Sequence, residues 1–334
     1  MYRLAAVLAL AAIAGLTLFS TAVQAEPNEI RIAKQYGLGY LQMMVMEDQK
    51  MVEKQARAAG LGDVKVTWAT FRSSDVMNDA LLSGSVDFVC LGIPGIAIIW
   101  AKTNGGVKAA SGFNFLPLQI NTRSDSIKGI RDFTDKDKIA LPAVKVSMQA
   151  ILLQMWAAKE FGDANALRLD PYTVSMTHPD GMAALLSGAG EINSHFTSPP
   201  FIQKELEKPG IRKLINSTEI LGGPISFNVV ATSAKFAQDN PRAYAAFMAA
   251  LQEATDFINR DKRAATEIYI KATNDKTPVD EMVKLLNDPA IEYSLVPKNV
   301  MQMVDFMYKA GTIKVRPASW KDLFFPSAHS MAGS

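Results

Sequence analysis

The sequence is poor in the residues that build disulfides, metal centres and nucleophilic active sites. Its 334 residues include one cysteine, Cys90, and three histidines. A single cysteine excludes an internal disulfide. The chain has no His-Glu-x-x-His motif, no Gly-x-x-x-x-Gly-Lys-Ser/Thr phosphate loop and no cysteine pair. We therefore expect no catalysis, no cofactor and no metal site.

The sequence also lacks an excess of either charge. Lysine and arginine total 35, against 33 aspartates and glutamates. This balance argues against nucleic acid or an anionic membrane as the main partner. Hydrophobic residues make up 49% of the chain, which is enough for a large apolar core without cross-links.

The amino-terminal segment has the features of a signal peptide. Arg3 is followed by an uncharged stretch, residues 4–25, that ends in Ala22-Val23-Gln24-Ala25. Small residues at this spacing favour cleavage after Ala25, while an uncleaved membrane anchor is the alternative. A lipid anchor would need a cysteine at the new terminus, and Cys90 lies far from it. The remaining chain is long enough for two domains.

Two similar units follow along the chain. Alternating apolar patterns predict strands and helices in the order that is typical of a parallel α/β sheet. The first unit has strands at 29–33, 64–68 and 86–90, with helices at 41–59 and 74–82. The second unit has strands at 139–142, 172–176 and 192–194, with helices at 148–161 and 179–187. The sequence Ala-Leu-Leu-Ser-Gly occurs in both, at 80–84 and at 184–188, and a strand and a proline turn follow each copy. Such a repeat predicts two lobes.

Two apolar stretches, 111–121 and 225–232, would carry the chain between these lobes and serve as a hinge. Helices at 241–258 and 278–309 would pack back on the first lobe. We therefore expect lobe 1 to comprise residues 28–120 plus 228–334, and lobe 2 to comprise residues 121–227.

These features resemble those of a known family. The first strand opens onto Gln35-Tyr36-Gly37, and the segment 80–88 leads into Gly92-Ile93-Pro94. Together with 128–142 and Ser147, they are similar to the substrate-binding proteins of nitrate, sulfonate and taurine ABC importers, and to the related binders of thiamine-pyrimidine precursors. Asp135-Lys136-Asp137-Lys138 departs from the family's usual Leu-Lys-Gly-Lys-x-Ile run. The resemblance covers about residues 28–260 and is more topological than motif-exact.

The resemblance implies the type II periplasmic-binding-protein fold, an α/β fold with two lobes joined by two crossings. It also implies a periplasmic, monomeric receptor whose partners are a small-molecule ligand and the permease of an ABC importer. The ligand would lie between the lobes at the carboxyl ends of the parallel strands, where open α/β sheets bind ligands in general.

The predicted ligand-binding residues lie on loops at strand ends and on the two crossings. They are Gln35, Tyr36, Gly37, Ser73, Ser74, Gly92, Ile93, Pro94, Asn114, Ser147, Met148, His195, Phe196, Thr197 and Phe227. The glycines allow close backbone approach, and helix ends at Ser147 and at Ser73-Ser74 favour an anion. The alternatives are a plain turn at Gln35-Gly37 and at Gly92-Pro94, an ordinary helix cap at Ser147, and a structural role for His195.

Of the other two histidines, His178 is the weaker candidate and His329 looks inert. Few basic residues lie near these loops, and this scarcity favours an organic ligand over a compact inorganic anion such as nitrate. Sulfonate, taurine-like and pyrimidine ligands all remain open. Two further alternatives are a biosynthetic enzyme for the thiamine pyrimidine, which the single cysteine disfavours, and the sensing domain of a regulator.

Overall fold

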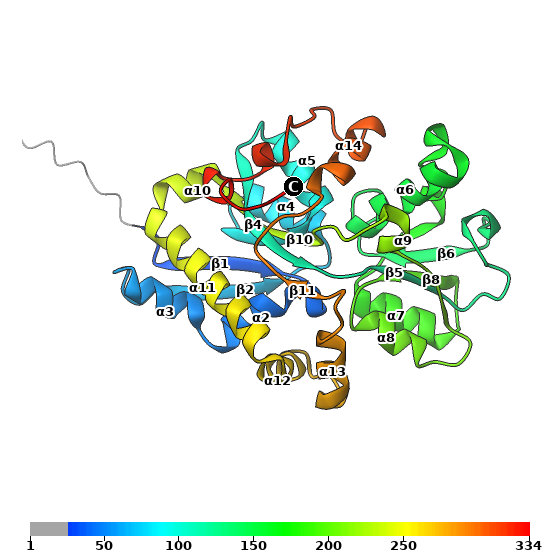
Figure 1. The fold of residues 1–334 in the computed structure, drawn as a ribbon, viewed down its shortest axis with the longest axis horizontal. Coiled ribbons are helices and arrows are strands. Elements are labelled where there is room, and N and C mark those ends of the chain that lie inside the picture. Colours follow the sequence, from blue (N-terminus) through cyan, green and yellow to red (C-terminus); the bar gives the residue numbers. More distant parts are fainter. Residues whose placement is uncertain (1–25) are drawn as a thin grey trace, which may run out of the picture.

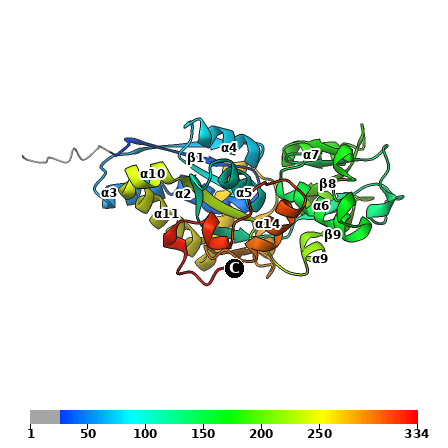
Figure 2. The same ribbon diagram turned by 90° about the horizontal axis from the view of Figure 1, so that it is seen from above.

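Two separate β-sheets, each covered by helices, make up the protein (Figure 1). The computed structural model describes residues 26–334. The predicted signal peptide, residues 1–25, lies outside the described residues. We call the first sheet with its helices lobe 1 and the second sheet with its helices lobe 2, which lie side by side in both views (Figure 2).

The sheet of lobe 1 has the strand order β11-β4-β10-β3-β1-β2. Its strands are β1 (Glu29–Lys34), β2 (Lys65–Thr70), β3 (Phe88–Gly92), β4 (Val107–Phe115), β10 (Asn228–Ser233) and β11 (Glu292–Tyr293). Strands β1, β2 and β3 are parallel, whereas β10 runs antiparallel to both β3 and β4. The three strands predicted for the first unit are therefore present and form a parallel set.

The sheet of lobe 2 has the order β7-β6-β8-β5-β9. Its strands are β5 (Gln119–Thr122), β6 (Lys138–Leu141), β7 (Thr173–Ser175), β8 (Ile192–Thr197) and β9 (Arg212–Asn216). Strands β6, β7 and β8 are parallel, and β5 is antiparallel to β8 and β9. In each sheet, the antiparallel neighbour of the parallel set is the strand that follows a crossing between the lobes.

Helices cover both sheets. In lobe 1 they are η1 (Leu38–Tyr40), α2 (Leu41–Asp48), α3 (Met51–Ala58), α4 (Ser74–Leu82), α5 (Ile93–Lys102), α10 (Ala234–Asp239), α11 (Pro241–Arg260), α12 (Lys262–Thr273), α13 (Val279–Leu286), α14 (Val300–Lys309), η5 (Trp320–Leu323) and η6 (Pro326–Ala328). In lobe 2 they are η2 (Ile130–Asp132), α6 (Met148–Phe161), η3 (Asp163–Asn165), η4 (Asp170–Tyr172), α7 (His178–Ser187), α8 (Phe201–Leu206) and α9 (Ser217–Leu221).

The repeated Ala-Leu-Leu-Ser-Gly segment ends a helix in each lobe. It closes α4 in lobe 1 and α7 in lobe 2, and Gly84 and Gly188 follow with φ angles of 72° and 69°. This left-handed conformation is the usual way to end a helix, and glycine adopts it without strain. The repeat therefore marks equivalent elements, as the sequence predicted.

Three predicted elements are interrupted in the structure. The helix expected over 41–59 is divided at Lys50, whose φ is 50°. The crossing expected over 111–121 consists of the end of β4, the turn 116–118 and β5. The helix expected over 278–309 is divided into α13 and α14, with the short strand β11 between them. Local periodicity predicts apolar faces, but it does not show where the backbone turns.

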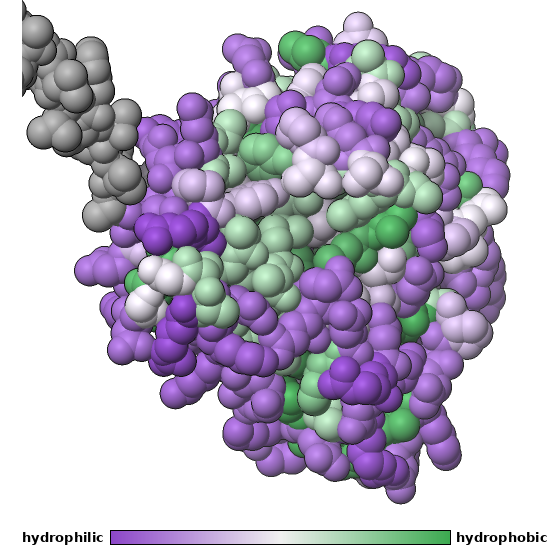
Figure 3. Space-filling model, turned by 60° about the vertical axis from the view of Figure 1, so that its left-hand side comes forward, coloured by the Kyte–Doolittle hydropathy of each residue, from purple (hydrophilic) through white to green (hydrophobic). Residues whose placement is uncertain are grey.

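The core is one contiguous set of apolar side chains, and Ile30, Ile32, Phe88, Phe113 and Phe247 within it are fully buried. Within residues 26–334, no helix is both long enough and apolar enough to cross a membrane. On the face shown in Figure 3, hydrophilic residues predominate, and hydrophobic ones gather in smaller groups between them.

Candidate functional site

A small cavity lies between the lobes, with walls from both. Lobe 1 contributes Gln35, Tyr40, Ser74, Gly92, Phe227 and Asn228, and lobe 2 contributes Pro142, Ser147, Met148, Gln149 and His178. We call it the interlobe cavity; its volume is ≈ 20 Å³. It lies where β1, β3 and β6 end and β10 begins, which are the strand ends expected to hold a ligand.

Four α-helices begin at this cavity. Helices α4 and α7 begin at the lining residues Ser74 and His178, while α5 and α6 follow the lining residues Gly92 and Ser147. The Ser147 hydroxyl accepts a hydrogen bond from the Ala150 amide at 3.2 Å and so fixes the start of α6. Each helix start carries a partial positive charge and unpaired N–H groups, so the four together favour an anionic guest.

The interlobe cavity has no charged wall. Within residues 26–334, none of its lining side chains is lysine, arginine, aspartate or glutamate. Burial raises the pKa of the Tyr40 phenol well above its ordinary value, so its O–H keeps its proton. An anion bound here would therefore be held by helix starts and neutral donors.

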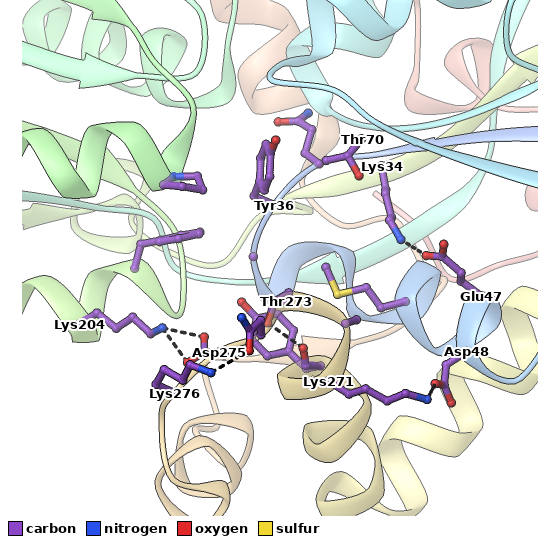
Figure 4. Close-up of a pocket in the computed structure, with 18 residues that line it drawn as sticks. Lys34, Tyr36, Glu47, Asp48, Thr70, Lys204, Lys271, Thr273, Asp275 and Lys276 are labelled. Atoms are coloured by element: carbon purple, nitrogen blue, oxygen red, sulfur yellow. Dashed lines mark hydrogen bonds and ion pairs between the residues drawn. The ribbon is translucent and has the colours of Figure 1, made fainter.

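A wider groove lies between the lobes beside the cavity (Figure 4). This outer groove has a volume of ≈ 810 Å³. Its walls are Lys34, Gln35, Tyr36, Gly37, Met44, Glu47, Asp48, Thr70, Pro179, Phe201, Lys204, Tyr269, Lys271, Ala272, Thr273, Asn274, Asp275 and Lys276. It shares Gln35 with the interlobe cavity, and Pro179 in its wall directly follows His178. The outer groove therefore adjoins the interlobe cavity at these residues.

Ion pairs line the outer groove. Lys34 pairs with Glu47, and Lys271 pairs with Asp48 at 2.7 Å. The hydrogen bond from Lys271 is the main reason that the pKa of Asp48 lies below its ordinary value. These pairs neutralise most of the charge in the groove.

One pair in the outer groove joins the lobes. Lys204 of α8 donates to both carboxylate oxygens of Asp275, which follows α12, at 2.7 Å each (Figure 4). Burial alone would raise the pKa of Asp275, but hydrogen bonds from Lys204 and Thr277 lower it. The Asp275 side chain is 4% exposed, so this pair is shielded from solvent.

Behind the cavity, a chain of buried polar groups runs into lobe 2. Nδ1 of His195 lies 2.5 Å from a Glu205 carboxylate oxygen, and Nε2 of His195 lies 3.2 Å from Nδ1 of His178. Nε2 of His178 lies 3.2 Å from the side-chain nitrogen of Gln149. We call Glu205, His195, His178 and Gln149 the histidine chain. Its cavity end is formed by His178 and Gln149, which both line the interlobe cavity.

The strand register and a glycine position this chain. His195 lies in β8 opposite Asn121 of β5 and Ala140 of β6, so its ring is held at the centre of the sheet. Helix α7 crosses it at Gly181, where an added Cβ would lie 2.7 Å from His195 Nε2. Burial and the nearby charge of His195 together lower the pKa of His178 well below its ordinary value.

The structure brings eight of the fifteen predicted site residues to the two hollows. Gln35, Ser74, Gly92, Ser147, Met148 and Phe227 line the interlobe cavity, and Tyr36, Gly37 and again Gln35 line the outer groove. Thr197 lines neither hollow, but its hydroxyl lies 3.1 Å from Nδ1 of His178, which lines the cavity.

The other six predicted residues also line neither hollow. Ile93 and Phe196 are fully buried in the apolar core. Asn114 is buried and donates to the Gly39 carbonyl at 2.8 Å, and Ser73 is buried beside Asp75. Pro94 is buried in the first turn of α5. His195 is fully buried behind His178, because residues of one strand face alternate sides and its ring points into lobe 2.

Five residues of the interlobe cavity were not predicted: Tyr40, Pro142, Gln149, His178 and Asn228. His178 was weighed and ranked below His195, although its place before Pro179 at a helix start is the same signal that identified Ser147. Gln149 lies two residues after that serine, within the same first turn. Helix starts were therefore a better guide to the cavity than strand ends.

Cys90 is buried, and burial raises the pKa of its thiol well above the ordinary value, so the thiolate is disfavoured. Over residues 26–334, no group of three or more histidine, cysteine or acidic side chains is arranged to hold a metal ion.

Comparison with known proteins agrees with this geometry. The NMT1-like family matches residues 24–272 of the chain. No curated protein sequence matches it. A solved structure of the alkanesulfonate-binding protein SsuA from Xanthomonas axonopodis pv. citri, bound to MOPS, is similar with a TM-score of 0.67 at 18% identity, covering 86% of this chain and 95% of that one.

Two further solved structures are similar. A Candida albicans gene product with the generic periplasmic binding protein fold has a TM-score of 0.68 at 13% identity, covering 89% of this chain and 96% of its own. The periplasmic nitrate-binding protein NrtA from Synechocystis PCC 6803 has a TM-score of 0.60 at 15% identity, covering 78% of this chain and 70% of its own. The predicted two-lobed periplasmic-binding-protein fold is thereby confirmed.

Proposed function

The chain belongs to the NMT1-like family, and we propose that it is a periplasmic receptor that closes two lobes on a small organic anion and delivers it to an ABC importer. The lobes in this proposal comprise residues 28–120 plus 228–334 and residues 121–227. The sulfonate-binding and nitrate-binding proteins of similar fold support an anionic ligand.

The observation that carries the proposal is the meeting of four helix starts at one uncharged cavity between the lobes. Helix starts and hydroxyls can bind a sulfonate or carboxylate without a buried arginine or lysine. Met148, Phe227 and Pro142 add apolar wall beside these donors. Such a mixture suits an organic anion with a small apolar body better than a bare inorganic ion.

The size of the cavity indicates how the ligand enters. A volume of ≈ 20 Å³ is space for about one water molecule, so a ligand requires the lobes to separate. The Leu38 N–H of lobe 1 donates to the Pro199 carbonyl of lobe 2 at 3.0 Å, and such direct contacts must break as the lobes open. A hinge at the two crossings would permit this movement.

Native mass spectrometry of the protein purified from periplasm tests the proposal. We expect a co-purifying small molecule that carries a sulfonate or carboxylate group. Gly92→Ala should weaken its retention, because the new Cβ would lie 3.4 Å from Met148 Cβ and narrow the space between these two walls of the cavity. The matched control is Gly129→Ala, whose Cβ would meet no atom within 4 Å.

Equal retention of the same molecule by Gly92→Ala and by the wild type would show that it binds elsewhere. A protein that chemically converts the molecule on incubation would instead be an enzyme. Either result would overturn the receptor assignment to this cavity.

A further inference from the structure

The histidine chain behind the interlobe cavity has no role in the receptor function described so far. Glu205, His195 and His178 are 0%, 0% and 5% exposed. Buried ionisable groups cost stability unless they are paired and hydrogen-bonded. The hydrogen-bond partners of each side-chain nitrogen and oxygen therefore indicate where the protons lie.

Both oxygens of Glu205 have polar partners. One oxygen accepts from the Asn121 side-chain nitrogen at 2.9 Å, and Asn121 is held in that orientation because its own oxygen accepts from Gln119 at 2.6 Å. The other oxygen faces His195 Nδ1 at 2.5 Å. As a carboxylate, Glu205 would accept from both of these partners.

The buried carboxylate needs a positive partner. Across the part of the chain that the structure describes, His195 is the one basic side chain within ion-pair distance of Glu205. The neighbouring Lys204 is directed to Asp275 instead. An imidazolium at His195 would pair with a Glu205 carboxylate through Nδ1–H and would present a second proton at Nε2.

In that form of His195, two donors face Nδ1 of His178. They are Nε2–H of His195 at 3.2 Å and the hydroxyl of Thr197 at 3.1 Å. Thr197 is fully buried, and its hydroxyl has no other side-chain partner within residues 26–334. A hydroxyl hydrogen in such a place needs an acceptor, which only an unprotonated Nδ1 provides.

With Nδ1 unprotonated, the neutral His178 ring carries its proton on Nε2, at the cavity end of the chain. There Nε2–H meets the Gln149 amide at 3.2 Å. A half-turn of the amide, about a broad terminal torsion, offers its oxygen to His178 and leaves its NH₂ group toward the cavity. In this arrangement, the histidine chain presents hydrogen-bond donors, and no acceptors, to the cavity.

We propose that the buried Glu205–His195 pair locks His178 in its Nε2–H tautomer, so that His178 and Gln149 form a donor wall in which the Gln149 NH₂ group selects ligands bearing an anionic oxygen. Gln149 contacts the ligand, whereas His178, His195 and Glu205 are positioning residues. The ligand class in this inference rests on the proposed function, whereas the tautomer of His178 does not. It explains how a cavity without lysine or arginine discriminates in favour of anions.

Nitrogen-15 NMR of the histidine rings in the ligand-free protein tests the tautomer. The chain has three histidines, so single His178→Gln and His329→Gln variants assign every ring signal. At neutral pH, we expect His178 to be protonated at Nε2 alone and His195 to be protonated at both nitrogens. Protonation of His178 at Nδ1, or a mixture of its tautomers, would overturn the inference.

A paired substitution tests the role of the positioning residues. In the His195→Leu/Glu205→Leu double variant, apolar side chains replace the ion pair without leaving a charge unpaired. His178 then loses one of its two Nδ1 donors, and we expect its signals to move toward a mixture of tautomers. Glu207→Gln, a change at an exposed residue just beyond α8, is the control and should leave the His178 signals unchanged. Unchanged His178 signals in the double variant would refute the proposed lock. If the double variant does not fold, the wild-type spectrum alone tests the tautomer of His178.

Methanesulfonate is the probe for the ligand class, and methylammonium is its cationic counterpart. We expect methanesulfonate to shift the His178 Nε2–H resonance, and methylammonium to leave it in place. Methanesulfonate binding without a change at His178 would overturn the donor wall and leave the receptor function standing. Failure of methanesulfonate to bind, with the expected tautomer present, would instead count against the sulfonate ligand of the proposed function.

Discussion

At the scale of single residues, the position of each histidine decides what it can do. His195 and His178 lie on consecutive elements of lobe 2, yet only His178 reaches the cavity wall. His195 is surrounded by sheet and helix, so its substitution would disturb stability as well as binding. The residue type alone therefore does not show whether a histidine lines the cavity or positions a residue that does.

His178 also gives the protein a specific response to acid. Its folded-state pKa lies well below the ordinary value of 6.5, with burial as the main cause. The unfolded chain therefore takes up a proton near pH 6.5 that the folded chain refuses. Stability is fully present above that pH and is lost as the pH falls from 6.5 toward the folded-state pKa.

We predict that wild type loses about 1.4 kcal/mol more unfolding free energy than His178→Gln between pH 7.5 and pH 5.5. Glutamine keeps hydrogen-bonding groups in place but does not titrate. Urea unfolding at each pH measures the difference, with His329→Gln as a control that should follow wild type. Parallel curves for wild type and His178→Gln would show that His178 binds a proton equally in both states.

At the scale of elements, helix α7 lies unusually close to strand β8. Alanine in place of a helical glycine usually stabilises a helix by roughly 0.5–1 kcal/mol. At Gly181, the added Cβ would lie 2.7 Å from Nε2 of His195 and 3.0 Å from two ring carbons. The ring is held by Glu205 and His178, so it has little freedom to move.

Gly181→Ala should therefore destabilise the protein by about 1–3 kcal/mol, the cost of overpacking a core. In a His195→Ala background the ring is absent, and the same change should be neutral or stabilising. Chemical denaturation of the four proteins measures this coupling. An equal effect of Gly181→Ala in both backgrounds would show that a clash with the His195 ring is not the cause of the change in stability.

The elements of this fold differ in how far their sequences predict them. The parallel strands β1, β2, β3, β6, β7 and β8 were expected, because alternating or continuous apolar runs bounded by turn residues have a local signature. Antiparallel β9 was not expected, since Arg212–Asn216 lacks such a run and forms a strand only by pairing with β5. Pairing between distant segments leaves little trace in local patterns.

The site was predictable to the same extent. Gln35, Gly92 and Ser147 were found because strand ends and helix starts have local signatures. Glu205 was missed, because nothing within α8 distinguishes it from the exposed Glu207 two residues later. Its role depends on the distant Asn121 and on His195, ten residues earlier along the chain, and the fold alone brings these side chains together.

At the scale of the whole molecule, a few direct contacts hold the lobes together in this structure. The Lys204–Asp275 pair closes the outer groove, and a second ion pair joins Lys309 of α14 to Asp163 of η3 at 2.5 Å. The two pairs differ in exposure: the side chains of Lys204 and Asp275 are 24% and 4% exposed, those of Lys309 and Asp163 are 64% and 61%. Solvent screening makes exposed pairs weak, so the first should contribute more to closure.

Asp275→Asn should therefore shift the protein toward an open arrangement of the lobes. The substitution removes the charge that holds Lys204 and weakens two hydrogen bonds. We expect closure to become less favourable by about 1–2 kcal/mol, or roughly tenfold in the ratio of closed to open molecules. Small-angle X-ray scattering of the ligand-free protein should show a larger radius of gyration, and ligand affinity should fall by a similar factor. Asp163→Asn, which breaks the exposed pair, should leave both measurements close to wild type because such pairs contribute about 0–1 kcal/mol. Equal behaviour of the two variants would mean that neither ion pair governs closure, and that the helix starts at the interlobe cavity and the backbone contact between Leu38 and Pro199 hold the lobes instead.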